Sequence, residues 1–201
     1  AAALIGEHAD TPNAPFFLYM AHQAAHYPYE ASQNSIDRFS AKFLDGFDTR
    51  MKFAACVWEL DQSVGQVVDA LKGAGAYDNT VIFVASDNGA IPGKSGAGSN
   101  WPLRGGKFTL FEGGVRVPAF LHSPLLPAER IGARHSGLFH LTDIVPTFLD
   151  LAGAKMDPSK ARQLDGISQV QALWYGAPAP RHAVLLQADS YGYRKDPLGF
   201  S

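Results

Sequence analysis

The sequence predicts an α/β layered fold with a largely parallel central sheet. Short apolar runs typical of buried strands alternate with segments of helical periodicity, and two of these runs end directly in polar, chemically useful residues. The chain has 201 residues with 46% hydrophobic content, which is ordinary for a globular protein and enough to bury a sizeable core. These three observations favour one domain, or most of one, of the α/β class.

The elements follow in order along the chain. Residues 15–21, "PFFLYMA", predict a buried strand, and polar, histidine-bearing residues follow it. Residues 48–72 predict a helix, because apolar residues recur there at spacings of three and four. Gly73 and Gly75 supply the stop. Residues 80–85, "TVIFVA", predict a second strand rich in β-branched residues.

The second half continues the alternation. Residues 89–106 are rich in glycine and proline and predict a long loop, which inside a compact domain is usually functional. A third strand is expected around residues 115–121. Residues 141–153, "LTDIVPTFLDLAG", predict a helix capped by Thr142 or Asp143, with a proline in its first turn and a glycine at its end. A short strand is expected in "HAVLLQ", residues 182–187.

Charge and composition exclude several classes. The formal net charge of −2 gives no electrostatic case for binding nucleic acid or an anionic membrane surface. No apolar run approaches the roughly 18 residues that a membrane helix needs. The single cysteine, Cys56, excludes an internal disulfide, and no Asn-x-Ser/Thr sequon is present. Neither the compartment nor the oligomeric state follows from these features.

Polar residues follow two of the predicted strands at the point where each ends. Asp87 and Asn88 follow residues 80–85, and His22 and His26 follow residues 15–21. Open α/β sheets bind ligands at the carboxyl ends of their strands. Carboxylate and amide oxygens are hard ligands that suit Ca²⁺ or Mg²⁺. The alternative is a turn, because Asp-Asn-Gly is common in turns.

A basic, glycine-rich segment follows these polar residues. Arg104, Lys107 and Arg116 stand among glycines in "GSNWPLRGGKFTLFEGGVR", and cations beside exposed backbone N–H groups suit an oxyanion pocket. A phosphate-binding P-loop needs Gly-x-x-x-x-Gly-Lys-Ser/Thr. Here "GGK" is followed by Phe108 and has Trp101 where the first glycine should stand. The pattern therefore argues against a nucleoside triphosphatase.

Four blocks resemble consecutive blocks of the sulfatase family. They read "PFFLYMAHQAAHYPYE", "NTVIFVASDNGA", "GSNWPLRGGKFTLFEGGVRVPAFLHSPLLP" and "LTDIVPTFLDLAG", and the resemblance runs over about residues 14–188. The branch that looks nearest is the arylsulfatase B-like, or N-acetylgalactosamine sulfatase, branch. The resemblance implies an alkaline-phosphatase-like α/β/α sandwich and hydrolysis of sulfate esters of sugars or aryl compounds. It also implies a lysosomal, secreted or periplasmic setting.

Two other functions are open. A phosphodiesterase-type hydrolase of the alkaline phosphatase superfamily would share the metal end of the site, although "NWPLRGGK" argues against it. A non-catalytic sulfatase-like binding protein is the other alternative.

The resemblance assigns roles to four residues. Asp87 and Asn88 match the family's second pair of ligands for a divalent cation, usually Ca²⁺, with Mg²⁺ as the other candidate. Lys107 matches the lysine that holds the sulfate group. His26 matches the histidine that hydrogen-bonds the sulfate or the leaving oxygen. Histidine can supply a proton near neutral pH, and a fixed cation stabilises developing negative charge.

Other polar residues of these blocks receive structural roles. His22 matches no family position well and is expected at the surface or behind the site. Arg104, Glu112 and Arg116 are expected to form ion pairs that hold the loop. For Trp101, a substrate-pocket wall and ordinary packing are equally good interpretations.

The chain departs from the family pattern at the nucleophile. The family uses a formylglycine made within a Cys/Ser-x-Pro/Ala-x-Arg signature, whereas Cys56 stands in "KFAACVWELD" and lacks it. The family's first metal-ligand pair, Asp-Asp, is also absent. The resemblance therefore implies a partial catalytic domain over residues 1–188, with residues 189–201 beginning a connection to a C-terminal subdomain.

Three expectations follow from this departure. The formylglycine is expected upstream of these residues, and the chain alone is expected to be inactive. A partly covered sheet is expected to expose an apolar patch of roughly a thousand square ångströms.

Overall fold

The computed structural model describes residues 1–9, 11, 14–40, 48–91, 97–154 and 164–187. The chain divides into two compact units, residues 1–125 and residues 126–201, which are described separately below. The expected connection at residues 189–201 lies outside the described residues, so that boundary stays a prediction.

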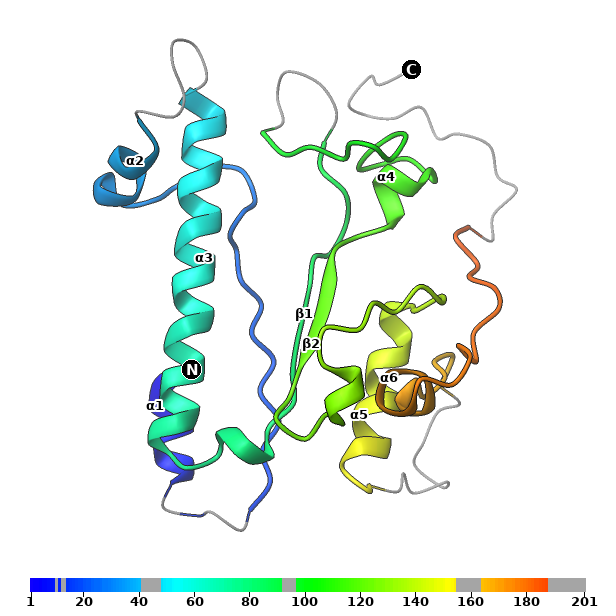
Figure 1. Cartoon of the computed structure of the whole chain (residues 1–201). Coiled ribbons are helices and arrows are strands. Elements are labelled where there is room, and N and C mark those ends of the chain that lie inside the picture. Colours follow the sequence, from blue (N-terminus) through cyan, green and yellow to red (C-terminus); the bar gives the residue numbers. More distant parts are fainter. Residues whose placement is uncertain (10, 12–13, 41–47, 92–96, 155–163, 188–201) are drawn as a thin grey trace. The chain divides into compact units, whose positions relative to one another are not determined.

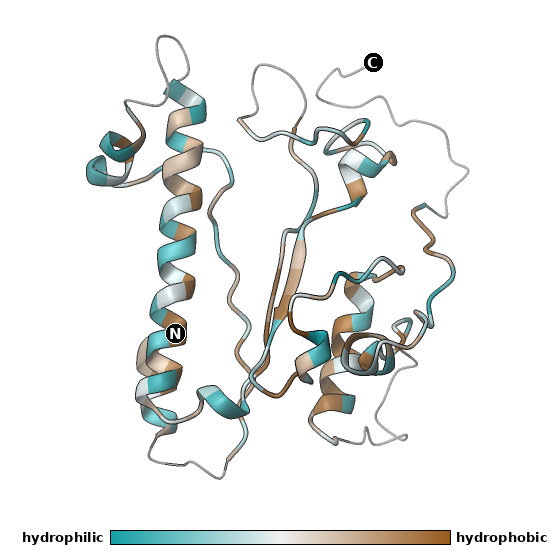
Figure 2. Ribbon diagram, in the orientation of Figure 1, coloured by the Kyte–Doolittle hydropathy of each residue, from teal (hydrophilic) through white to brown (hydrophobic). Residues whose placement is uncertain are grey.

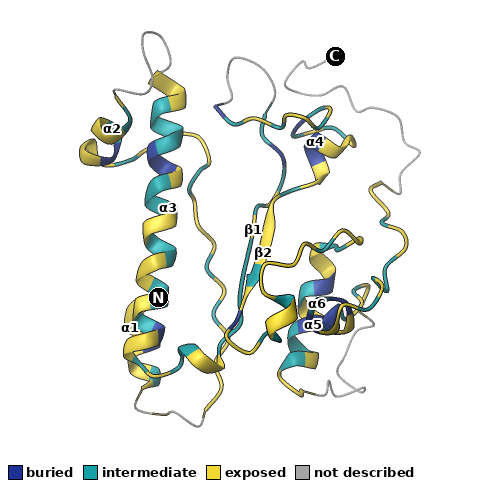
Figure 3. Ribbon diagram, in the orientation of Figure 1, coloured by how far each residue is buried: buried dark blue, intermediate teal, exposed yellow. Residues whose placement is uncertain are grey.

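Three helices form one part of the first unit. They are α1 (Ala2–His8), α2 (Gln33–Ser40) and α3 (Asp48–Gly73), and both shorter helices contact α3 (Figure 1). The expected helix over residues 48–72 is thus confirmed. Apolar and polar residues alternate along α3 (Figure 2), and half-buried positions alternate with exposed ones, with Ala55, Cys56 and Leu71 buried (Figure 3). Its amphipathic pattern therefore decides which face packs.

Local chemistry explains where α3 begins and ends. Asp48 stands in its first turn and pairs with Lys52 at 2.8 Å, one helical turn later. At the other end Gly75 adopts φ +67°, and the N–H of Ala76 donates to the carbonyl oxygen of Leu71. A left-handed glycine at this place is the usual helix stop.

A two-stranded sheet forms the second part of this unit. β1 (Ile82–Ala85) follows the 3₁₀ turn η1 (Tyr77–Asn79), and β2 (Ala119–His122) pairs with it antiparallel, with Ile82 opposite His122. A short helix, α4 (Glu112–Val115), precedes β2. The strand expected over residues 80–85 is confirmed as β1, and the strand expected around residues 115–121 is confirmed as β2, which starts at residue 119. The expectation of a largely parallel sheet is not met by this pair.

The expected strand at residues 15–21 is not formed in the structure. Exposure alternates only from residue 17 onward, with Phe17 and Tyr19 exposed and Leu18 and Met20 half-buried, whereas Phe16 is exposed like Phe17. A strand also needs a backbone ladder, and residues 15–21 have none among the described residues. Residues 182–187 likewise lack the expected strand. The apolar sequence of residues 15–21 was therefore not sufficient to predict a strand, because a strand also depends on a hydrogen-bonded neighbour.

Many large apolar side chains are exposed. The most exposed of them, at 66% or above, are Phe17, Tyr19, Tyr27, Trp101, Phe108, Ile131, Tyr175 and Leu185. This agrees in direction with the expected apolar surface, and its area stays a prediction. No helix among the described residues combines the length and the hydropathy needed to cross a membrane.

The second unit contains short helices. They are η2 (Ala128–Arg130), η3 (Leu141–Asp143), α5 (Ile144–Leu151) and α6 (Val170–Tyr175). The expected helix near residues 142–152 is confirmed, with Pro146 in the first turn of α5 and Gly153 at φ +62° after it. Asp143 stands at the N-cap position of α5, as expected, but its side chain makes no cap hydrogen bond there. The side chain of Asp143 instead accepts from the backbone N–H of His140 in a capping box that opens η3.

Asp143 instead anchors the second unit. Its carboxylate is fully buried and accepts a hydrogen bond from Nε of Arg181 on Oδ2, at 2.8 Å, and a second from Nη2 of Arg181 on Oδ1. It also accepts bonds from the backbone N–H of His140 and Ile167 and from Nε2 of Gln169. Burial alone would raise the pKa of Asp143, but these hydrogen bonds lower it to about 2 from an ordinary 3.8. The buried charge is therefore fully partnered.

We predict that Asp143 contributes a measurable acid dependence to stability. A lowered pKa stabilises the folded state above pH 3.8, and this contribution is lost as the pH falls from 3.8 towards 2. The shift corresponds to about 2 kcal/mol of unfolding free energy. Denaturant unfolding between pH 6 and pH 2 should show this loss, and Asp143→Asn should remove it at the cost of lower stability at pH 6. An identical acid slope in both proteins would contradict the role given to Asp143.

Candidate functional site

The segment after β1 is joined to the glycine loop, defined here as residues 97–116, by backbone hydrogen bonds. The N–H of Gly89 donates to the oxygen of Gly114 at 3.0 Å, and the N–H of Lys107 donates to the oxygen of Ala90 at 3.0 Å. Within the loop, the N–H of Gly113 donates to Arg104 at 2.7 Å. These bonds fix Lys107 directly beside the residues that follow Asp87 and Asn88.

Asn100 locks the same junction from its side chain. Its Oδ1 accepts from the N–H of Ala90 at 2.8 Å, while Nδ2 donates to the oxygens of Ala90 at 2.8 Å and Gly105 at 3.1 Å. The side-chain amide thus pairs with both the N–H and the carbonyl oxygen of Ala90, as the backbone of a neighbouring strand would. Sequence reasoning missed Asn100, since an asparagine in a glycine-rich loop is common for turn chemistry alone.

Three glycines permit this close approach. A Cβ on Gly89 would overlap the carbonyl oxygen of Gly113, and one on Gly114 would overlap that of Thr109. A Cβ on Gly113 would meet the oxygen of Arg104 at 2.6 Å. Backbone atoms cannot swing away as a long side chain can, so these positions require glycine.

Asp87 and Asn88 form a turn at the end of β1. The exposed Asp87 accepts a hydrogen bond on Oδ1 from the N–H of Asn88 at 2.8 Å, and Nδ2 of Asn88 donates to Gly89 at 2.9 Å. The chain bends at these two residues and both side chains make local hydrogen bonds, in keeping with the turn alternative. Oδ2 of Asp87 and Oδ1 of Asn88 accept no hydrogen bond among the described residues. These two oxygens remain available to a cation.

Lys107 is half-buried, and its charge is not neutralised within the described part of the chain. Its Nζ has no carboxylate within 4.0 Å there, and it lies 5.5 Å from the ring centroid of Phe108. A fixed, unpaired ammonium group attracts an anion more strongly than a fully solvated one. The backbone bond to Ala90 anchors the main chain of Lys107 two residues after Asn88.

His26 is exposed on the segment between the extended residues and α2. Its Nδ1 lies 2.6 Å from the carbonyl oxygen of Tyr27, which can only accept, so Nδ1 carries the hydrogen and Nε2 is left free. The segment reaches the glycine loop through Tyr29, whose hydroxyl accepts from the N–H of Ala97 at 3.3 Å. The structure thus joins the backbone of Lys107 to Ala90, two residues after Asn88, and the printed link between the His26 segment and the loop among the described residues is Tyr29. That the four side chains face one another stays a prediction.

His22 and Ser63 do not form a nucleophilic pair. Nε2 of His22 lies 3.2 Å from Oγ of Ser63, which already donates its one hydrogen to the carbonyl of Leu60 at 2.8 Å. His22 therefore donates to the serine and cannot activate it as a base. This agrees with the expected surface position of His22.

Cys56 is likewise no nucleophile. It is buried on α3 and its Sγ donates to the oxygen of Glu30 at 3.4 Å. Burial, reinforced by the charge of Glu59, raises the pKa of the thiol. A reactive thiolate needs the opposite environment.

Three further residues of the glycine loop, Arg104, Arg116 and Trp101, have different environments. Arg116 pairs with Glu112 at 3.2 Å, as expected. Arg104 was expected to form an ion pair, but its guanidinium lies 4.1 Å from the ring centroid of Phe111 instead. Trp101 is 87% exposed, so within the described residues it is not a packing residue.

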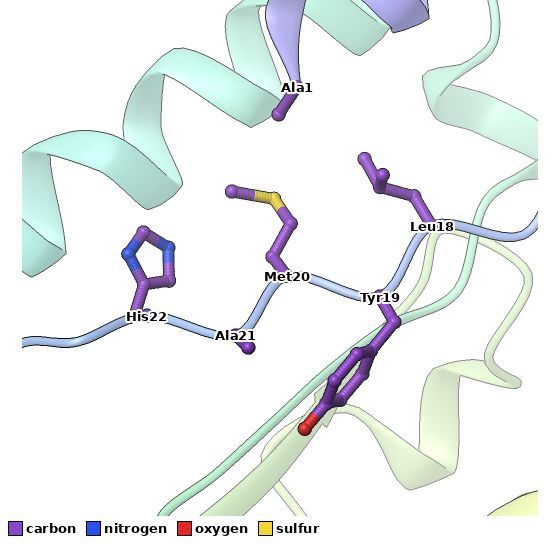
Figure 4. Close-up of a pocket in the computed structure, with 6 residues that line it drawn as sticks. All are labelled: Ala1, Leu18, Tyr19, Met20, Ala21 and His22. Carbon is purple, nitrogen blue, oxygen red and sulfur yellow. The ribbon is translucent and has the colours of Figure 1, made fainter.

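A separate hollow lies along the extended segment. It has a volume of about 240 Å³ and is lined by Ala1, Leu18, Tyr19, Met20, Ala21 and His22 (Figure 4). It shares no residue with the glycine loop, and its only titratable lining side chains are Tyr19 and His22. The polar site and the hollow are thus distinct features.

No complete metal site is present among the described residues. They contain no group of three or more His, Cys, Asp and Glu side chains able to hold a metal ion. Asp87 and Asn88 offer two hard oxygens, whereas Ca²⁺ takes six to eight. The donor chemistry fits a hard divalent cation, and the number of donors is incomplete.

The comparisons with known proteins identify the family. The sulfatase family model matches residues 1–154, so the chain belongs to the sulfatase family. The chain is 38% identical over 178 residues to mouse arylsulfatase J and 36% identical over 179 residues to dog N-acetylgalactosamine-6-sulfatase. These alignments cover 89% and 88% of this chain but only 28% and 32% of the relatives. The chain therefore spans about a third or less of their length.

A solved structure supports the fold. The crystal structure of Ps i-CgsB in complex with k-i-k-neocarrahexaose matches with a TM-score of 0.73 and 34% identity, over 88% of this chain and 39% of that one. The fold is thus the alkaline-phosphatase-like α/β fold of sulfatases, represented here in part.

We predict opposite effects for two glycine substitutions. Gly89→Ala should lower the unfolding free energy by about 3 kcal/mol, because its Cβ would overlap backbone that cannot move aside. Gly65→Ala, in the middle of α3 with open space around it, should raise it by roughly 0.5–1 kcal/mol. Urea unfolding of both variants tests this. Equal stability of Gly89→Ala and wild type would contradict the close approach.

Proposed function

We propose that the protein hydrolyses sulfate esters of sugars or aryl compounds with the help of a divalent cation. One observation carries the proposal: Lys107, an unpaired cation within the described residues, is bonded through its backbone to Ala90, directly after the Asp87–Asn88 turn. A fixed cation beside hard oxygens suits an anionic ester whose charge grows during the reaction. The net reaction consumes one water molecule: the ester S–O bond breaks, an S–O bond to the oxygen of water forms, and the products are an alcohol or phenol and hydrogen sulfate.

Lys107 is proposed to hold the sulfuryl oxygens. Its half-buried position and the fixed backbone mean that little reorganisation is needed as charge develops. His26 is proposed to act at the leaving oxygen through Nε2, which the Nδ1–Tyr27 hydrogen bond leaves free. When protonated, Nε2 can donate to that oxygen as the ester bond breaks.

Asp87 and Asn88 are proposed as ligands of the cation, most simply Ca²⁺. When bound, such an ion polarises the sulfuryl group and stabilises negative charge. Oδ2 of Asp87 and Oδ1 of Asn88 are the atoms available to hold it. Further ligands must come from elsewhere, because two oxygens do not fill the shell.

The nucleophile is proposed to lie outside these residues. The sequence contains no Cys/Ser-x-Pro/Ala-x-Arg signature, and both Cys56 and Ser63 have environments that disfavour reaction. The 201-residue chain alone is therefore proposed to be inactive. The names of two relatives, N-acetylgalactosamine-6-sulfatase and arylsulfatase J, support a sulfated sugar as the natural substrate and an aryl sulfate as a usable one.

We predict that Lys107→Ala in the full-length gene product lowers turnover of a chromogenic aryl sulfate by about 100-fold or more. The reason is the loss of a preorganised charge on the developing anion. Lys52→Ala is the control, because Lys52 pairs with Asp48 on α3 and belongs to no site. Wild-type turnover by Lys107→Ala would contradict the assignment. Faster wild-type cleavage of an aryl phosphodiester than of the aryl sulfate would favour the phosphodiesterase alternative.

A second prediction concerns the cation. After chelation, the full-length gene product should bind Ca²⁺ in a calorimetric titration, and Asp87→Asn should weaken this binding by about tenfold or more, because affinity follows ligand charge. Asp78→Asn, at an exposed aspartate of η1, should leave it unchanged. Equal Ca²⁺ affinity in Asp87→Asn and wild type would exclude Asp87 as a ligand.

A further inference from the structure

Phe108 has an unusual backbone conformation. Its φ is +74°, and among the described residues it is the only non-glycine with a positive φ. The left-handed region is unfavourable for any residue with a Cβ and is a genuine outlier for a bulky one. Glycine would fit this position without strain.

The turn around Phe108 enforces this conformation. The N–H of Thr109 donates to the oxygen of Gly106 at 3.0 Å, and its Oγ1 donates to the same oxygen at 2.7 Å. In return the N–H of Gly106 donates to Oγ1 of Thr109 at 3.2 Å. Three hydrogen bonds therefore close the turn over Lys107 and Phe108 and hold both residues in place.

Burial does not explain why a phenylalanine stands there. The side chain is 67% exposed, and its ring contacts the cation of Lys107, whose Nζ is 5.5 Å from the ring centroid. A strained backbone usually persists where surrounding structure enforces it for a functional reason. Here the strain places an aromatic ring, open to solvent in the described structure, beside the cation proposed to hold sulfate.

We propose that the ring of Phe108 forms the apolar wall of the subsite for the ring that carries the sulfate. This inference rests on the proposed function, in which Lys107 holds the sulfuryl oxygens. The carbon that bears the sulfate is joined to it through one ester oxygen, so the substrate ring must lie directly beside the sulfuryl group. An aromatic face stacks on the C–H face of a sugar or on an aryl ring. Phe108 therefore selects esters of cyclic alcohols and phenols.

The test separates recognition of the ring from recognition of the sulfate. The full-length gene product is compared with Phe108→Gly, Phe108→Trp and Leu110→Ala, a control at an exposed residue of the same loop. Three quantities are measured: KM for 4-nitrophenyl sulfate, KM for N-acetylgalactosamine 6-sulfate, and the inhibition constant of inorganic sulfate. The unfolding free energy of each variant is measured by urea denaturation.

The inference predicts a higher KM for a ring-bearing ester without weaker sulfate binding and without lower stability. Phe108→Gly should raise KM for at least one ring-bearing ester by about five- to tenfold, the range expected for loss of an aromatic contact. It should leave the inhibition constant of sulfate unchanged and should not lower stability, because glycine relieves the backbone strain. Phe108→Trp should restore KM, and Leu110→Ala should match wild type. The ester whose KM rises identifies a sugar or an aryl ring as the occupant.

Several outcomes would overturn the inference. An unchanged KM with lowered stability would mean that the ring packs against another part of the protein. A parallel rise of both KM values and the sulfate inhibition constant would mean that Phe108 acts through Lys107. If the wild-type protein hydrolysed neither ester, the proposed function itself would fail, which is a different result from an unaltered Phe108→Gly variant.

Discussion

The close approach of two backbone segments at Gly89 and Gly113 is the constraint on which the candidate site depends. A Cβ on Gly89 would overlap the carbonyl of Gly113, so the segment after β1 and the glycine loop can meet only through glycine. Backbone bonds from Gly89 and Lys107, together with the side chain of Asn100, then hold the two segments in one register. The chemistry of the site is placed by main-chain geometry.

This junction fixes the backbone position of Lys107 although its side chain is only half-buried. The backbone of Lys107 is held by its hydrogen bond to Ala90 and by the hydrogen-bonded turn from Gly106 to Thr109. The side chain of Lys107 therefore starts from a well-defined Cα position. Preorganised charge lowers a barrier because no reorganisation is needed at the moment of reaction. The left-handed conformation of Phe108 is the local cost of that same turn.

The sequence predicts what depends on local pattern. The periodicity of α3, the strand before Asp87 and the glycine-rich loop all follow from neighbouring residues, and the residue blocks alone resemble the sulfatase family, to which the chain belongs. Tertiary partners are a different matter. The three hydrogen bonds of Asn100 and the bond between Asp143 and Arg181, 38 residues apart, depend on contacts that no local pattern encodes.

The predicted strand at residues 15–21 does not form because a strand also depends on a tertiary partner. Exposure alternates only over residues 17–21, and no strand ladder forms with this segment among the described residues. The roles of Asp87, Asn88, Lys107 and His26 came from the family resemblance and stay predictions. Within the described residues, the geometry adds two oxygens without a hydrogen bond, an ammonium group without a carboxylate partner and an imidazole Nε2 without a hydrogen bond.

The most direct measurement is a crystal structure of the full-length gene product with bound selenate, which mimics sulfate and is located by its anomalous scattering. The account predicts one selenate whose oxygen accepts a hydrogen bond from Nζ of Lys107, beside a cation held by Asp87 and Asn88. Selenate bound at another place, with the ammonium group of Lys107 contacting only solvent or a carboxylate, would contradict it.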